Sequence, residues 1–175
     1  MIFDFLNAHR ADLQYAAGLL LGLAMLRRGG GPERAVALIF CGLLLVPAIA
    51  FRLLASGTMI FGSFAPVYVA LDCAALAAFV LIALNANRNY PLWIAGFQIV
   101  AVGAHLVKGV VDTVSPLAYV LLAVGPSYCQ LALMAAGLVR HRARVRRFGS
   151  YRDWRKGHSM PWAAFLSGGR SRHAG

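Results

Sequence analysis

The stretch AVALIFCGLLLVPAIAFRLLA, residues 35–55, decides the fold, because it sets one charged residue, Arg52, among twenty uncharged and mostly apolar ones. A bilayer core about 30 Å thick asks for about 20 mostly apolar residues in one helix. Three more stretches of this kind follow, at residues 64–84, 91–111 and 115–139. The sequence therefore predicts an all-α protein, a polytopic bundle of membrane-spanning helices.

A fifth span is expected before these four, at residues 11–27. Its uninterrupted apolar run covers only residues 16–26, so Gln14 must also lie inside the membrane for this segment to span. A cleaved signal peptide is disfavoured, because Asp4 stands where such a peptide is basic. The alternative is a surface segment, which would leave four spans with both chain ends in the cytoplasm.

Composition excludes an ordinary soluble domain. Apolar residues make up 60% of the 175-residue chain and charged residues only 13%, against about 45–50% and about 25% in soluble domains. The three cysteines, Cys41, Cys73 and Cys129, all fall inside predicted spans. There we expect them to act as small apolar packing residues, not as metal ligands or disulfides.

The charge is distributed unevenly along the chain. Residues 140–175 contain ten of the 17 Lys and Arg residues, and the predicted loops at 27–34 and 85–91 contain four more. By the positive-inside rule these segments face the cytoplasm, which places the N-terminus outside and the C-terminus inside. We therefore divide the chain into a transmembrane bundle, residues 1–139, and a basic cytoplasmic tail, residues 140–175, whose distal part we expect to be disordered.

Two ionisable residues fall within the apolar spans, where they are costly and therefore functional candidates. At 1.5 Å per residue, Asp72 lies about 18 Å and His105 about 21 Å from the cytoplasmic ends of neighbouring antiparallel helices. We therefore expect the two side chains to meet. Gln98 lies seven residues before His105, on the same helix face.

The other spans carry polar or helix-disturbing residues at a similar depth. These are Gln14 and Tyr15, Pro47, and the segment GPSY at residues 125–128, which ends in Tyr128. Each proline removes a helical hydrogen bond, and the carbonyl it frees needs a donor or water. We expect an aqueous pocket in the outer half of the bundle. Asp72 and His105 either fix helix packing through a hydrogen bond there or form a site that moves protons or binds a small polar ligand.

Further polar groups lie nearer the outer surface and in the tail. Lys108 and Asp112 are four residues apart and are expected to pair at the outer surface. The tail interleaves basic and aromatic residues, which favours contact with anionic lipid over nucleic acid, and no nucleic-acid partner is expected. Its predicted lipid-facing residues are Arg140, Arg142, Arg144, Arg146, Arg147, Arg152, Trp154, Arg155 and Lys156.

Residues 85–108, NANRNYPLWIAGFQIVAVGAHLVK, resemble a group of small uncharacterised multi-span proteins of alphaproteobacterial type. In that group a PLWxAGFQ-like stretch precedes a helical histidine. The matching residues here are Pro91, Leu92, Trp93, Ala95, Gly96, Phe97, Gln98 and His105. The resemblance implies a bacterial inner membrane and supplies no activity.

Nucleotide-binding, metalloprotease and hydrolase motifs are absent from the sequence. We therefore expect no enzyme activity, no cofactor and no metal. The first functional hypothesis is an accessory or scaffold subunit of an inner-membrane assembly, with a membrane-protein partner or a second copy of the chain. The alternative is a small transporter or proton-coupled binding protein that uses Asp72, His105, Tyr128, Gln98 and Gln14.

Overall fold

The computed structural model describes residues 9–54, 65–110, 116–149 and 152–155. Its helices are α2 (Arg10–Arg28), α3 (Gly31–Ile39), η1 (Phe40–Leu45), α4 (Val46–Leu54), α5 (Ala65–Asn85), α6 (Tyr90–Val110) and α7 (Pro116–Phe148). Segments α3, η1 and α4 follow one another without a break. The prediction of an all-α fold is confirmed, since the described residues contain helices and no strand beyond one isolated bridge.

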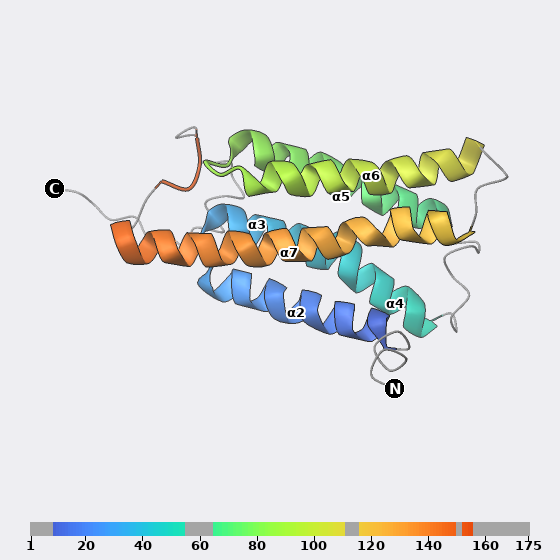
Figure 1. Ribbon diagram of the computed structural model, residues 1–175, viewed down its shortest axis with the longest axis horizontal. Coiled ribbons are helices and arrows are strands. Elements are labelled where there is room, and N and C mark those ends of the chain that lie inside the picture. The colour runs from blue at the N-terminus through green and yellow to red at the C-terminus, as the bar shows by residue number, and fades with distance from the viewer. Residues whose placement is uncertain (1–8, 55–64, 111–115, 150–151, 156–175) are drawn as a thin grey trace.

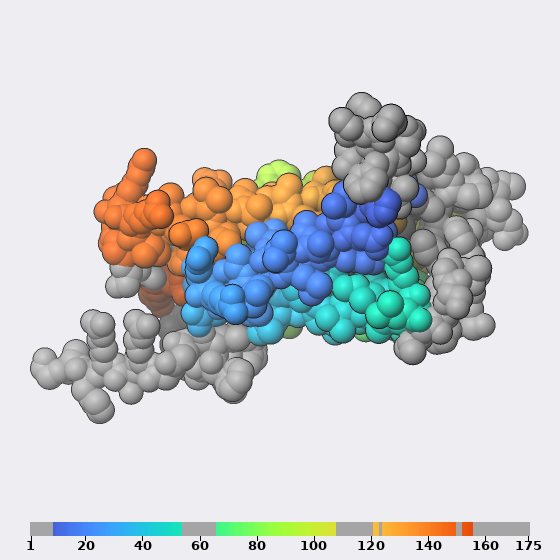
Figure 2. Space-filling model, turned by 90° about the horizontal axis from the view of Figure 1, so that it is seen from below, coloured from blue at the N-terminus to red at the C-terminus, as the bar shows by residue number. Residues whose placement is uncertain are grey.

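Three helices in the described part of the chain are long and apolar enough to cross a membrane. They cover Gly31–Leu53, Pro66–Asn85 and Tyr90–Val107, and each falls on one of the predicted spans. The helices run side by side as a bundle (Figure 1), and Figure 2 shows α2 lying between α7 and the α3–α4 helix on one face. α7 continues to Phe148, so the first basic residues of the tail extend this helix.

Close packing of α2 against η1 depends on two glycines. A Cβ atom on Gly18 would lie 3.0 Å from a methyl carbon of Leu45, and one on Gly22 would clash with the sulfur of Cys41. Gly18 and Gly22 form the GxxxG spacing that lets helices approach closely in membranes. Gly18 and Gly22 therefore allow close packing between two helices of the same chain.

Pro47 lies next to a widened helical turn. The N–H of Val46 donates to the carbonyl of Cys41, five residues back, so η1 is a π-helix. Pro47 follows directly and has no N–H to donate. Such π-turns within α-helices occur frequently at functional sites, which makes the surroundings of η1 a candidate site.

The two halves of the bundle differ in how they are filled. Buried apolar side chains fill the half near the α2–α3 and α5–α6 loops. The largest of those that are fully buried are Met25, Val36, Phe79, Ile82, Ile94 and Met134. The other half contains a cavity of about 440 Å³. The candidate site therefore lies in the half of the bundle opposite the basic loops.

Candidate functional site

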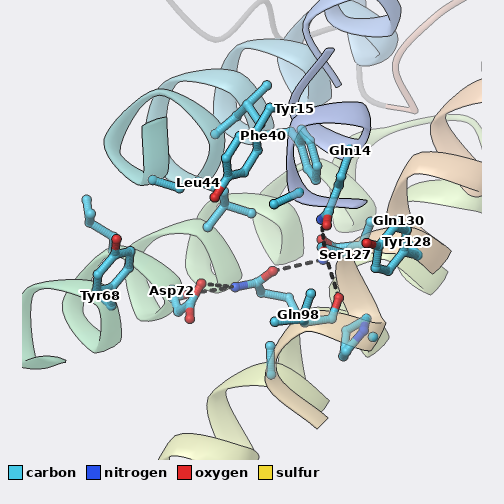
Figure 3. A pocket seen from close by; sticks show the side chains of 18 of the residues that line it. Gln14, Tyr15, Phe40, Leu44, Tyr68, Asp72, Gln98, Ser127, Tyr128 and Gln130 are labelled. Carbon is cyan, nitrogen blue, oxygen red and sulfur yellow. Dashed lines mark hydrogen bonds between the residues drawn. The ribbon is translucent and has the colours of Figure 1, made fainter. Parts of the chain in front are cut away.

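The cavity is formed where α2, η1, α5, α6 and α7 meet. Its apolar side comes largely from η1, through Leu43, Leu44 and Leu45. The polar side chains that line it are Arg10, Gln14, Tyr15, Tyr68, Asp72, Gln98, His105, Ser127, Tyr128 and Gln130, of which Figure 3 labels eight. The volume lies within the range of small-molecule sites, about 300–1,000 Å³.

Asp72 and His105 meet on the cavity wall, as counting residues along the two helices predicts. The Nε2 atom of His105 lies 2.9 Å from Oδ2 of Asp72. The side chains are 13% and 19% exposed, respectively. Both groups are therefore largely removed from solvent yet border the cavity.

Gln98 joins the same cluster and extends it to α7. Its Nε2 donates to Oδ1 of Asp72 at 2.9 Å and to the Asp72 carbonyl at 3.3 Å. Its Oε1 accepts a hydrogen bond of 2.8 Å from Nε2 of Gln130. Gln98 and Gln130 are each 1% exposed. The result is a chain of hydrogen bonds from α7 through α6 to α5, drawn as dashed lines in Figure 3.

Gln14 and Tyr128 line the cavity but do not contact Asp72 through any hydrogen bond found in the described residues. Gln14 donates to the Ser127 hydroxyl at 2.5 Å, which joins α2 to α7. The same hydroxyl donates to the Val124 carbonyl at 2.6 Å. Tyr128 is 43% exposed. These contacts place Gln14 and the GPSY segment at one depth, as the sequence predicts.

The predicted pair of Lys108 and Asp112 lies outside the described residues, since Asp112 is not described and neither is the side chain of Lys108. The predicted tail residues divide into two groups. Arg140, Arg142, Arg144, Arg146 and Arg147 are exposed on the last turns of α7, and Lys156 is not described. Arg152, Trp154 and Arg155 belong to a segment that folds back onto the bundle.

That segment, residues 152–155, is fixed by hydrogen bonds to the α5–α6 loop and to the start of α3. The carboxylate of Asp153 accepts the N–H of Gly31 at 2.8 Å and a guanidinium N–H of Arg88 at 2.5 Å. The N–H of Arg155 donates to the Asn85 carbonyl at 2.7 Å. Trp154 lies against Gly31, where a Cβ atom would be 2.7 Å from the indole nitrogen. Trp154 therefore packs on the body of the protein.

Arg88 binds a second carboxylate, that of Glu33, and this pair is almost fully buried. The Glu33 side chain is 0% exposed and that of Arg88 is 7% exposed. Glu33 also accepts the N–H of Gly30 at 3.1 Å, which caps α3. We call Glu33, Arg88 and Asp153 the basic-end clasp, since they join the start of α3 and the α5–α6 loop to the segment after α7.

Sequence reasoning missed the clasp and Gln130. The available signal was the position of the acids: Glu33 and Asp153 are isolated carboxylates within strongly basic segments. An isolated acid among many cations is a candidate for a structural ion pair. Gln130 carried a similar signal, as an amide within the apolar run of residues 129–139.

His141 lies beside the clasp and beyond the predicted span. Burial, with the charges of Arg88 and Arg34, lowers the pKa of His141, and Asp153 partly opposes this effect. A lowered pKa in the folded state means that the unfolded chain binds the proton more strongly. The stability from neutral His141 is therefore present above the unfolded value, about 6.5, and declines as the pH falls below it.

We therefore expect protonation of His141 at acidic pH to destabilise the folded protein at the clasp. From about pH 7.5 to about pH 5.5, the thermal stability of the wild type should fall more than that of the variant His141→Gln. Thermal unfolding of both proteins in the same detergent at each pH measures this difference. Parallel pH dependence in the two proteins would contradict the assignment to His141.

The described residues contain no group of three or more His, Cys, Asp or Glu side chains close enough to hold a metal ion. The polar side chains that line the cavity instead offer one carboxylate, one imidazole, one guanidinium, three phenol groups, amides and a hydroxyl. This arrangement can hold a proton between Asp72 and His105 and can donate or accept hydrogen bonds toward a ligand. Comparisons with family models, with curated proteins and with solved structures each gave no match to this chain.

Proposed function

We propose that this chain is a multi-pass protein of a bacterial inner membrane whose cavity binds a small molecule in a proton-linked manner, as a small transporter does. The observation that carries the proposal is the hydrogen-bonded pair of Asp72 and His105 on the wall of the 440 Å³ cavity. Ionisable groups inside membrane spans are expensive and typically mark substrate or proton pathways. Histidine serves as a proton shuttle in many proteins, and an adjacent carboxylate can share its proton.

The topology we propose has five spans, with the N-terminus outside and the C-terminus in the cytoplasm. Support for the fifth span comes from α2, which packs alongside α3 and α7. Support for the orientation comes from charge: Arg27, Arg28, Arg34 and Arg88 lie at the end of the bundle from which α7 extends with its arginines. A basic end of this kind faces the cytoplasm.

Labelling of single cysteines in intact cells tests this topology. In a background with Cys41, Cys73 and Cys129 replaced by serine, His9→Cys should react with a membrane-impermeant maleimide applied from outside. Arg146→Cys should react only after the cells are lysed. If both positions require lysis, the chain has four spans and both ends lie in the cytoplasm.

Ligand-induced thermal stabilisation tests the binding function. The purified protein in lipid nanodiscs is heated with a cationic, an anionic and a neutral aromatic compound of matched size, at pH 6 and at pH 8. We expect at least one compound to raise the unfolding temperature in a pH-dependent manner. The effect should disappear in Asp72→Asn and remain in Asp12→Asn, which removes a carboxylate that does not line the cavity. Failure of all three compounds at both pH values would count against the proposed function.

The accessory-subunit function is a second proposal, favoured by one feature. The last turns of α7, residues 140–148, present exposed arginines at the basic end of the bundle. Such a surface suits anionic lipid or an acidic partner. Purification in a mild detergent followed by mass spectrometry tests it, because an accessory subunit must bring a stoichiometric partner with it.

A further inference from the structure

The hydrogen bonds around Asp72 show which of its neighbours donates to it. The carbonyl of Ile94 can only accept, so the group of Gln130 that lies 3.2 Å from it must be the amide nitrogen. The same nitrogen lies 2.8 Å from Gln98, which must therefore present its oxygen there. This leaves the nitrogen of Gln98 to donate to Asp72 Oδ1. Oδ1 of Asp72 therefore accepts a hydrogen bond, a contact that stabilises a carboxylate.

His105 is the basic side chain that contacts this carboxylate, with Nε2 2.9 Å from Oδ2 of Asp72. Among the described side chains, the other titratable or charged groups that line the cavity are Tyr68 on α5, Tyr128 on α7, and Tyr15 and Arg10 on α2, while η1 contributes none. Arg10 is exposed at the first turn of α2, and no ion pair joins it to Asp72 in the described part of the chain. When His105 is neutral, no other cationic side chain that the structure describes forms an ion pair with Asp72.

The remaining surface of the cavity suits an apolar body that carries one positive group. Tyr68 lies one helical turn before Asp72, on the same face of α5. The rings of Tyr15, Phe40 and Tyr128 lie around the same space (Figure 3). Aromatic faces beside a carboxylate recognise ammonium groups through cation–π and charge attraction. The Tyr15 ring already stacks with Arg52, whose guanidinium carbon lies 5.7 Å from the ring centroid.

We propose that the cavity binds a small monovalent organic cation, an ammonium group on an apolar body, in exchange for the proton of His105. The inference rests on the proposed function and names its ligand class. On binding, the imidazolium of His105 releases its proton to water, and the ammonium group takes its place as the counter-charge of Asp72. Cation and proton then compete for a single negative charge.

Titration of nanodisc-embedded protein with 2-phenylethylammonium, by isothermal calorimetry at several pH values, tests the exchange. Displacement of one proton by each cation predicts that the affinity rises by up to about tenfold per pH unit while His105 is protonated. At pH values where His105 carries no proton, the affinity for the cation should no longer change with pH. Repeating the titration in buffers of different ionisation enthalpy should show one proton released for each cation bound.

Three variants sharpen the test. Asp72→Asn should lower the affinity at least about a hundredfold, since the counter-charge is lost. His105→Gln should still bind the cation, with an affinity that no longer depends on pH and with no proton released. Asp12→Asn, whose carboxylate pairs with Arg52 outside the cavity lining, should behave as the wild type.

Phenylacetate and 2-phenylethanol have the same ring and a different head group. Titration with these two compounds distinguishes a wrong ligand class from the absence of a binding cavity. Binding of either one in preference to the cation would overturn the ligand class and leave a binding cavity in place. A cation affinity with the same pH dependence in His105→Gln as in the wild type would overturn the exchange with His105. Absence of saturable binding by all three compounds would overturn this inference together with the proposed function.

Discussion

Replacing Arg88 with methionine is expected to lower the free energy of unfolding by about 3–5 kcal/mol. Methionine fills much of the volume of the arginine stem but removes the guanidinium that both Glu33 and Asp153 bind. Glu33 is 0% exposed, so its carboxylate would remain buried without its counter-charge. Asp153 is 31% exposed, and water can compensate it in part. Most of the loss therefore comes from Glu33.

Chemical denaturation of the purified variant in detergent measures this loss. The matched control is Arg146→Met, an exposed arginine on α7, which should change stability by less than about 0.5 kcal/mol. The double variant Glu33→Gln with Arg88→Met should recover part of the loss, because it no longer buries an unpaired charge. Equal effects of the Arg88 and Arg146 variants would show that the clasp contributes nothing to stability.

Replacing Gln98 with leucine is expected to lower the free energy of unfolding by about 3 kcal/mol. Gln98 is 1% exposed and holds the middle position in the chain of hydrogen bonds. Its loss removes a donor from the Asp72 carboxylate and an acceptor from Gln130. Hydrogen bonds to charged groups are worth about 1.5–3 kcal/mol, more than neutral ones.

Gln130→Leu provides the comparison, because it leaves the donor to Asp72 in place. We expect it to destabilise the protein less than Gln98→Leu, since only neutral partners lose a hydrogen bond. Gln14→Leu, which removes the hydrogen bond to Ser127, serves as a second reference. Unfolding of the three variants under one set of conditions ranks them. A larger effect at Gln130 than at Gln98 would contradict the direction of hydrogen bonding derived above.

The contact between Asp72 and His105 could be predicted from the sequence because it depends on helix geometry and on one short loop. The rise per residue of an α-helix is constant, and a short loop forces α5 and α6 to run antiparallel as neighbours. Counting from the loop then gives the depth of each residue. The same reasoning placed Gln98 on the face of His105 and Gln14 level with the segment that contains Ser127, as their hydrogen bonds show.

The clasp could not be predicted in this way. Glu33, Arg88 and Asp153 lie far apart in the sequence, and their contact depends on how three loops meet at one end of the bundle. No periodic pattern carries that information. The π-helix at Phe40–Leu45 was also missed, although Pro47 marked the helix as irregular, because a proline can produce a kink or a widened turn.

The clasp also has a consequence for the order of events during synthesis. Gly31 and Asp153, which share a hydrogen bond, are separated by 122 residues. At about 5–20 residues per second, the ribosome needs about 6–24 s to cover that distance. During this interval α3 and the α5–α6 loop are already made, but the carboxylate that joins them to the segment after α7 is not. A chain released before residue 153 can contain helices α2 to α7 and still lack this connection, so formation of the clasp requires that translation has passed α7.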